Sequence, residues 1–164
     1  MVIIIMGVSG SGKTTIGKHL TQALGLPFYD ADDFHPIANV AKMKRGEPLT
    51  DADRIPWLNT LAECVQSWQT KGGAVLACSA LKESYRQILV KHAQEDIKWV
   101  FLDGSKALIE SRMALRKNHF MPSALLDSQL NTLEKPDYGI HINIDTTSDL
   151  IVEELLIKLK NDRN

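Results

Sequence analysis

The feature that most limits how this chain can fold is a glycine-rich segment close to its first residue. The segment reads Gly7-Val8-Ser9-Gly10-Ser11-Gly12-Lys13-Thr14 and satisfies the pattern GxxxxGK[ST]. It follows the apolar run Val2–Met6 and precedes a run with helical periodicity, the strand-loop-helix context that a phosphate-binding loop requires. Glycines let successive backbone N–H groups face one concavity, and the following helix adds the positive end of its dipole. The sequence therefore predicts a nucleotide phosphate site rather than a chance glycine-rich turn.

The side chains and backbone of this loop have separate expected roles. Lys13 is expected to reach the β- and γ-phosphates of ATP, and the hydroxyl of Thr14 is expected to ligate Mg²⁺. The backbone N–H groups should surround the phosphate oxygens. The residues predicted to bind ATP in this segment are Gly7, Ser9, Gly10, Ser11, Gly12, Lys13, Thr14 and Thr15.

Short apolar runs alternate with segments of helical periodicity, a pattern that indicates a parallel sheet covered by helices on both faces. Because the apolar runs are continuous, we expect the strands to be buried on both faces. The predicted strands are Val2–Met6, Pro27–Asp30, Ala74–Ser79, Trp99–Leu102 and Ile140–Asp145. The predicted helices are Thr14–Leu24, Ala52–Thr70, Leu81–His92, Lys106–Lys117, Ser123–Leu133 and Ser148–Lys160. Thr50 and Asp53 predict a capping box at the start of the second of these helices.

The length of the chain and its even composition indicate one domain. The 164 residues are a usual size for a domain with one core, and no repeat or Pro/Gly/Ser-rich linker divides them. We therefore predict a single α/β domain over residues 1–164 with the three-layer P-loop NTPase fold. It should contain a five-stranded parallel sheet, helices on both faces, and a small helical lid over about residues 117–133.

Charge and hydropathy exclude several classes of protein. The chain has 19 Lys and Arg against 20 Asp and Glu, so its net charge of -1 offers no footprint for nucleic acid or an anionic membrane. No apolar run approaches the ~20 residues of a spanning helix, and no secretory signal is visible, so we expect a cytoplasmic protein. The two cysteines, Cys64 and Cys78, lack zinc-site spacing and are expected to be small buried side chains.

Two aspartates follow the second predicted strand. The run Val75–Ser79 ends in serine, so the carboxylate that holds Mg²⁺ in many P-loop proteins must come from another strand. Asp30 and Asp32 alternate in side-chain direction, so they need not share one task. We interpret Asp30 as the Mg²⁺ partner and Asp32 as the group that faces the acceptor hydroxyl. The alternative is an acidic loop that only caps the next helix. No NKxD string is present, which disfavours guanine specificity.

Beyond the loop, the sequence resembles the gluconate kinases, small members of the shikimate-kinase and nucleoside-monophosphate-kinase-like group. The resemblance runs nearly end to end, and its strings occur in the family's order. They are Asp30-Ala31-Asp32-Asp33-Phe34-His35-Pro36, Asn39, Lys42-Met43, Gly46-Glu47-Pro48-Leu49-Thr50-Asp51, Asp53-Arg54-Ile55-Pro56-Trp57-Leu58, Cys78-Ser79-Ala80-Leu81-Lys82, Tyr85-Arg86, Arg116-Lys117-Asn118-His119-Phe120-Met121-Pro122, Ser128-Gln129-Leu130 and Thr132-Leu133-Glu134. Asn118 stands where the family has a glycine.

The resemblance implies a Mg²⁺-dependent, homodimeric enzyme that transfers the γ-phosphoryl group of ATP to the 6-hydroxyl of gluconate, giving 6-phosphogluconate. Two other functions remain open at this point. The first is another metabolite kinase of the same group, such as shikimate kinase. The second is a nucleotide-binding regulatory module without an acceptor, which the many polar groups beyond the strand ends disfavour.

A pocket for gluconate needs cations for one carboxylate and short polar groups for five hydroxyls. The residues predicted to bind this substrate are Asp32, His35, Arg54, Ser79, Lys82 and Arg86. Alternatively, Lys82 and Arg86 are solvated helix charges and His35 caps a helix through Lys42. Trp57 and Trp68 are expected in the core rather than stacked on sugar.

Arg112 and Arg116 are four residues apart on a predicted helix that leads into the lid segment 117–122. Cations brought over the phosphates at lid closure would stabilise the charge of the transition state while closure excludes water. Both are therefore predicted to bind ATP, and Arg116 joins Lys13 and Asp32 as a predicted catalytic residue. The alternative is ordinary surface pairing. Residues 145–147 are expected to border the adenine.

Overall fold

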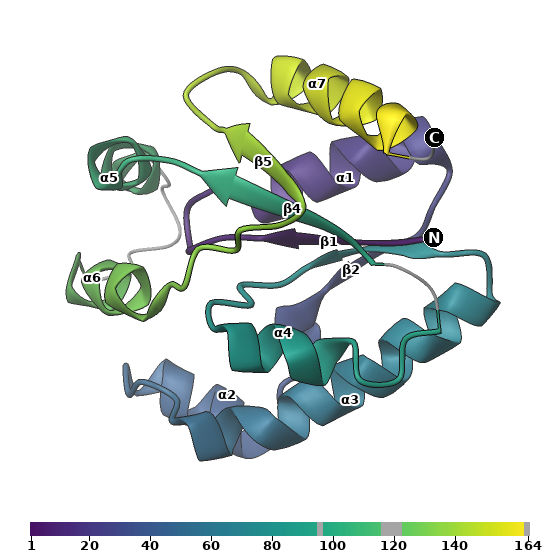
Figure 1. The fold of residues 1–164 in the computed structure, drawn as a ribbon. Coiled ribbons are helices and arrows are strands. Elements are labelled where there is room, and N and C mark those ends of the chain that lie inside the picture. Colours follow the sequence, from purple (N-terminus) through teal and green to yellow (C-terminus); the bar gives the residue numbers. More distant parts are fainter. Residues whose placement is uncertain (95–96, 116–122, 163–164) are drawn as a thin grey trace.

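The computed structural model describes residues 1–94, 97–115 and 123–162, and its centre is a five-stranded parallel sheet (Figure 1). Its strands lie in the order β2-β3-β1-β4-β5. Their bounds are β1 (Val2–Met6), β2 (Phe28–Asp30), β3 (Ala74–Ala77), β4 (Lys98–Asp103) and β5 (Ile140–Asn143). The predicted α/β fold is therefore confirmed. The carboxyl ends of the strands meet at one edge, the place where open parallel sheets bind ligands.

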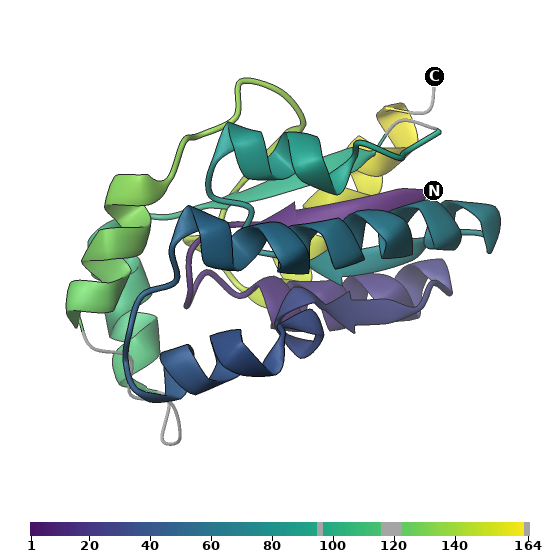
Figure 2. The ribbon, with the colours of Figure 1, turned by 90° about the horizontal axis from the view of Figure 1, so that it is seen from below.

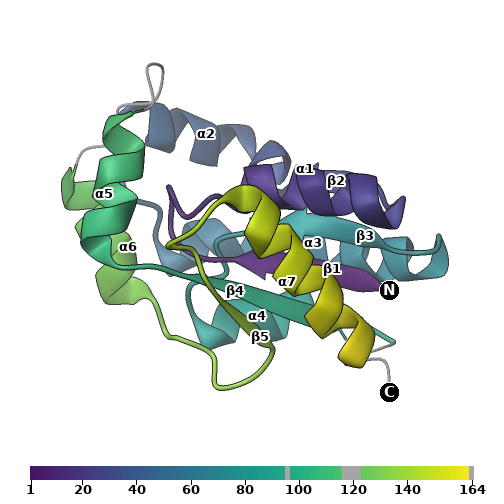
Figure 3. The same ribbon diagram turned by 90° about the horizontal axis from the view of Figure 1, so that it is seen from above.

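Helices cover both faces of this sheet. Figure 3 shows α1 (Lys13–Leu24) and α7 (Ser148–Asn161) on one face. Figure 2 shows the long α3 (Asp51–Thr70) across the other face, with α2 (Ile37–Lys44) and α4 (Glu83–Leu89) near it. At the carboxyl ends of the strands lie α5 (Lys106–Ala114) and α6 (Ser123–Thr132) (Figure 1).

The side chains of β1 divide the core into two clusters. Ile3 and Ile5 pack in the cluster under α1 and α7, whereas Val2, Ile4 and Met6 pack in the cluster under α3. All five are fully buried, as the continuous apolar run predicted. The same expectation is wrong for the two edge strands of the sheet. Phe28–Asp30 is half-buried along its length, and the burial of Ile140–Asn143 alternates with the two faces.

Most predicted elements occur, with shifts at their ends. Thr50 and Asp53 form the predicted capping box at the start of α3. The helix predicted over Leu81–His92 is shorter, because Ala80 has a φ of +43° and Lys82 is extended, so α4 begins only at Glu83. A 3-10 turn over Ala31–Phe34 follows β2. Of the predicted lid, residues 117–122 lie outside the described residues, and α6 accounts for most of the remainder.

Both tryptophans expected in the core are buried, and so is Cys78, whereas Cys64 is half-buried. Burial raises the pKa of the Cys78 thiol to about 12, which leaves it protonated and inert. Among the described helices, none combines the length and the apolar character needed to span a bilayer.

Candidate active site

The glycine-rich loop adopts a conformation that side chains would prevent. Gly10 has a φ of +82°, and a Cβ added there would lie 2.7 Å from Met113 Cγ. Gly7 faces Leu102, whose carbonyl oxygen would lie 3.1 Å from an added Cβ. Gly12 forms the N-cap of α1 without any side-chain capping hydrogen bond. The first N–H groups of α1 thus have no side-chain cap, which is the arrangement that binds phosphate.

Lys13 and Ser11 differ in what they offer a ligand. Lys13 Nζ donates to the carbonyls of Gly7, at 2.9 Å, and Val8, at 3.0 Å, so its ammonium lies across the loop. Ser11 is 1% exposed, and its Oγ has no hydrogen-bond partner among the described residues. Its N–H donates to Val8 O. The hydroxyl of Ser11 therefore lies inside the loop rather than toward a ligand.

The structure brings the two predicted metal ligands together. Thr14 Oγ1 donates to Asp30 Oδ2 at 3.0 Å, although they are on α1 and at the end of β2. Asp30 Oδ1 accepts the N–H of Asp32 at 3.1 Å, which orients the carboxylate. A hydroxyl beside a carboxylate supplies the oxygen ligands that Mg²⁺ prefers. The residues present thus fit ATP-bound Mg²⁺ at this position.

Asp32 lies close enough to Lys13 and Asp30 for both to act on its ionisation. Partial desolvation and the like charge of Asp30 raise the pKa of the Asp32 carboxyl, while Lys13 opposes the rise. The side chain is 84% exposed, so solvent screens these influences and weakens the rise in pKa. A raised pKa is what a group that accepts a proton needs.

His35 is a neutral side chain fixed beside this aspartate. Its ring stacks on Trp57 with centroids 4.2 Å apart, and Nε2 lies 3.9 Å from Asp32 Oδ1. Desolvation and the charge of Arg54 lower the pKa of His35 to about 4. Nδ1 lies 3.3 Å from Asn39 Nδ2, so His35 contacts α2, but it does not cap that helix as the alternative proposed, because the N-cap is Pro36 and no side chain caps it.

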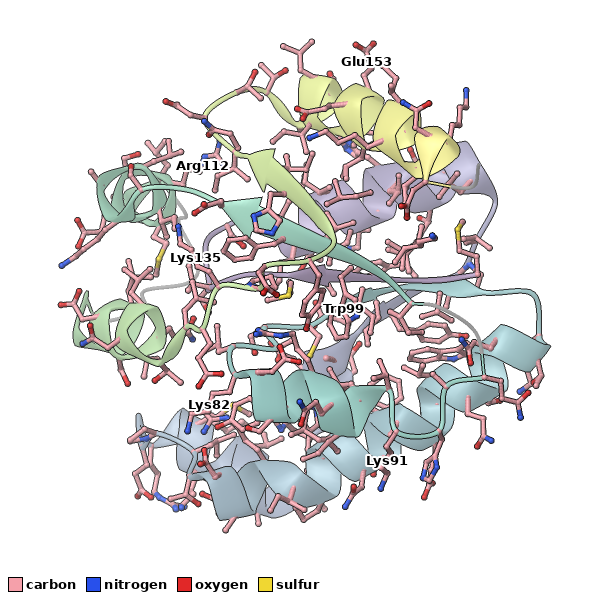
Figure 4. The ribbon with its side chains drawn as sticks, viewed as in Figure 1. Lys82, Lys91, Trp99, Arg112, Lys135 and Glu153 are labelled. Carbon is pink, nitrogen blue, oxygen red and sulfur yellow. The ribbon has the colours of Figure 1, made fainter. Side chains whose placement is uncertain are left out.

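A second group of charges surrounds the ring of Tyr85. Arg54 Cζ lies 5.6 Å from the ring centroid and Lys82 Nζ lies 5.5 Å from it. Asp51 accepts Lys82 Nζ at 3.0 Å on each oxygen and also accepts the hydroxyl of Tyr85. Figure 4 shows Lys82 at the left end of α4, above α2 and the start of α3. The structure therefore unites two predicted cations, Arg54 and Lys82, around one ring.

Ser79 and Arg86 differ from the other predicted acceptor residues. Ser79 accepts the N–H of Gly7 through its backbone carbonyl at 3.4 Å, so it lies against the phosphate loop. The side chain of Arg86 is 2% exposed. Within the described part of the chain, its hydrogen bonds go to oxygen atoms of the protein. The structure does not bring this guanidinium to the ring of Tyr85, so it gives no support to a direct contact with substrate.

Arg112 lies where the adenine was expected. Its Nη2 donates to the carbonyls of Ile144 and, at 3.2 Å, Thr146, in the loop between β5 and α7 (Figure 4). Its expected partner Arg116 lies outside the described residues.

Sequence reasoning assigned no role to three residues that the structure places in the site. Asp51 and Tyr85 hold Lys82, and their only signal was their occurrence within the family strings. Gln129 on α6 accepts the N–H of Ser9 at 2.7 Å and donates to Ser9 Oγ at 3.2 Å. Gln129 also occurs within a family string, Ser128-Gln129-Leu130, and this was the signal available for the contact.

Two surface cavities lie elsewhere on the described part of the chain. The larger, about 600 Å³, is lined by residues that include Trp99 and Tyr138. The smaller, about 390 Å³, is lined by residues that include Asp103 and His141. Neither lining contains a predicted site residue, so the charge clusters rather than cavity size locate the candidate site.

Known proteins resemble this chain along most of its length. The family model of shikimate kinase matches residues 9–155. A probable gluconokinase from Xenopus tropicalis is 46% identical, over 94% of this chain and 91% of its own. The thermosensitive gluconokinase of Escherichia coli is 44% identical, over 90% of this chain and 80% of its own.

Solved structures agree with these relatives. A gluconokinase from Sinorhizobium meliloti is 42% identical with a TM-score of 0.90, covering 98% of this chain and 91% of its own. An APS kinase from Mycobacterium tuberculosis, 18% identical with a TM-score of 0.72 over 97% of this chain and 96% of its own, shares the fold. The chain is thus an ATP-dependent kinase by descent, and it belongs to the gluconokinases within the shikimate kinase family.

Proposed function

We propose that this protein is a gluconokinase, which transfers the γ-phosphoryl group of ATP to the 6-hydroxyl of D-gluconate and releases ADP. The observation that carries this proposal is that Asp32 is close enough to Lys13 of the phosphate loop to feel its charge and lies 3.9 Å from His35, which in turn feels the charge of Arg54 beside Tyr85. A carboxylate in that position faces a phosphoryl donor on one side and a binding site for an acidic acceptor on the other. The relatives named gluconokinase support the choice of acceptor.

The phosphate loop performs the donor half of the reaction. Lys13 and the N–H groups at the start of α1 hold the phosphate oxygens and stabilise the charge that develops during transfer. Thr14 and Asp30 would hold Mg²⁺, which neutralises phosphate charge when bound. The other proposed ATP contacts are the loop residues Gly7, Ser9, Gly10, Gly12 and Thr15, together with Arg112 and Arg116. Ser11, predicted from the sequence, is left out of the proposal because its side chain is buried and its N–H donates to Val8 O.

Asp32 performs the acceptor half. Its carboxylate accepts a hydrogen bond from the 6-hydroxyl and takes its proton as the bond to phosphorus forms. Phosphoryl transfer has a loose transition state in most analyses, so aiming the oxygen matters more than removing its proton early. The side chain of His35 is 4% exposed and its Nδ1 contacts Asn39, so Nε2, beside Asp32, is the atom proposed to meet a neighbouring substrate hydroxyl.

The carboxylate of gluconate is bound by Arg54 and Lys82 in this proposal, and Ser79 contributes a hydroxyl near the phosphate loop. Tyr85 and Asp51 hold the two cations in place before substrate arrives. The proposal further takes residues 1–164 as one kinase domain with a lid over about residues 117–133, working as a cytoplasmic homodimer. Light scattering of the purified protein tests the dimer.

A coupled assay of ADP release tests the proposed function. With ATP and Mg²⁺, gluconate should give phosphorylated product. With shikimate, ADP should be released no faster than in a control reaction that contains no acceptor. ADP release with shikimate but not gluconate would favour the rival kinase reading. Nucleotide binding without ADP release for any member of a panel of sugar acids would favour the regulatory module.

A further inference from the structure

The turn that follows β3 has a strained backbone. Ala80 has a φ of +43°, and among the described residues it is the only non-glycine residue with a positive φ. Residues with a Cβ avoid this region, and they persist there only where the surrounding structure enforces it. Ser79, before Ala80, accepts the N–H of Gly7, and Lys82, after it, binds Asp51. The strained residue therefore lies between a contact to the phosphate loop and a proposed substrate cation.

Arg86 holds this turn from the protein interior. Its Nη1 donates to Ala80 O at 2.9 Å and to Leu81 O at 3.4 Å. Both carbonyls belong to the strained part of the turn, and the side chain that binds them is 2% exposed. Because the guanidinium is rigid and planar, the direction of Nη1, which serves both carbonyls, is fixed relative to Nε on the other side of the group, whereas the ammonium of a lysine has no such second anchor.

The buried charge of Arg86 is compensated on its other side. Nε donates to Glu83 Oε2 at 2.8 Å and to the hydroxyl of Tyr138 at 2.9 Å. That hydroxyl donates to the same carboxylate oxygen at 2.8 Å, and the guanidinium lies 5.9 Å from the centre of the Tyr138 ring. A buried ion keeps its position only when its hydrogen bonds are satisfied. These partners therefore fix the direction in which Nη1 points.

A further segment supports the same turn. Glu134, just after α6, donates its N–H to Leu81 O at 2.8 Å, and its carboxylate accepts the N–H of Glu83 at 2.7 Å. The turn is thus held by Arg86 from α4 and by Glu134 from the segment after α6, while Tyr138 from the loop before β5 holds Arg86. A strained backbone conformation persists when several surrounding contacts enforce it in this way.

We propose that Arg86 is a positioning residue for phosphoryl transfer. It holds the Ser79–Lys82 turn with Ala80 in the left-handed region, and so sets Ser79 against the phosphate loop and Lys82 against the acceptor. This assigns Arg86 a role through other residues, in place of the direct contact expected from sequence. The effect on gluconate rests on the proposed function, whereas the effect on the turn does not.

The test combines Arg86→Lys with Ala80→Gly. Lysine keeps the charge but loses the fork, so kcat/KM for gluconate should fall about 10- to 100-fold through misplacement of the turn. Glycine adopts a positive φ without strain. The double variant Arg86→Lys/Ala80→Gly should therefore have a kcat/KM at least about threefold higher than Arg86→Lys alone. The control Ala107→Gly, at an exposed position in α5, should recover nothing. Failure of Ala80→Gly to recover activity, or an unchanged kcat/KM in Arg86→Lys, overturns the proposal.

A measurement without substrate separates this proposal from the proposed function. In Arg86→Lys, the amide hydrogens of Gly7 and Glu134 should exchange at least about tenfold faster, because their acceptors belong to the released turn. Loss of a direct substrate ligand would leave these rates unchanged and would refute the positioning role. A wild-type protein inactive on gluconate would refute only the function. If Arg86→Lys does not fold, Tyr138→Phe replaces it, because this substitution removes one hydrogen-bond partner of Arg86 Nε. It should lower kcat/KM and speed the exchange of the same two amides, each by a smaller factor.

Discussion

Thr14 Oγ1 lies 3.0 Å from Asp30 Oδ2, which joins the first turn of α1 to the end of β2. The two residues are 16 apart in the chain and belong to different layers of the fold. Asp32 follows two residues later with its carboxylate turned to other partners. The geometry thus supports the proposed division of roles, with Thr14 and Asp30 for Mg²⁺ and Asp32 for the acceptor.

This separation predicts different defects for Asp30→Asn and Asp32→Asn. An amide at position 32 cannot take the proton, so kcat should fall about 10²- to 10⁴-fold with nearly unchanged affinity for ATP. At position 30 the lost charge weakens Mg²⁺ binding, so added Mg²⁺ should partly restore kcat. A Mg²⁺ titration of kcat for both variants checks this. Rescue of the Asp32 variant alone would reverse the two roles.

Lys82→Met should weaken gluconate binding while leaving ATP binding intact. The loss of a charged hydrogen bond to the substrate carboxylate corresponds to about a 10- to 100-fold rise in the KM for gluconate. Lys91→Met is the matched control, because Lys91 is an exposed residue close to the far end of α4 and donates to Asn59 (Figure 4). Its KM values should stay within about twofold of wild type. Equal effects of the two substitutions would remove Lys82 from the acceptor site.

Gln129→Leu should uncouple α6 from the phosphate loop. The substitution removes both hydrogen bonds to Ser9, so kcat/KM for ATP should fall about tenfold and stability by about 1–2 kcal/mol. Asn131→Leu places the same side chain at an exposed position of α6 and serves as the control. Steady-state kinetics with chemical denaturation measures both effects. Unchanged ATP kinetics in Gln129→Leu would show that the contact has no part in nucleotide binding.

The stability of the protein should fall as pH decreases from about 6.5 toward 4. The pKa of His35 is lowered from 6.5 to about 4 in the folded protein, so the unfolded chain binds the extra proton in that interval. The stability that the neutral ring contributes is present above pH 6.5 and is lost as pH falls through the interval. Solvent screening limits the loss to about 1–3 kcal/mol.

Urea unfolding of wild type and His35→Gln across pH 4–7 checks this dependence, with the exposed His92→Gln as the control. The slope of stability against pH should flatten in His35→Gln and persist in His92→Gln. A slope that persists in His35→Gln would assign the acid sensitivity to other groups.

Sequence patterns were sufficient for much of the fold because those patterns are local. The apolar run Val2–Met6 and the glycines after it placed a strand, loop and helix correctly, since each depends on residues close in the chain. The edge position of β5 could not be predicted from Ile140–Asn143 alone. Strand order depends on which helices cross which face, so a short apolar run does not reveal whether one side faces solvent.

The sequence by itself determined the phosphate loop, the parallel α/β fold and the family, because motif spacing and periodicity express backbone conformation directly. Only the tertiary structure decided which polar side chains share a site. Lys82 meets Asp51 across 31 residues and Ser9 meets Gln129 across 120 residues. Arg86, four residues after Lys82, is buried instead beneath the turn of Ala80. Such contacts depend on how helices pack against the sheet, and side chains of the same charge can then have opposite environments.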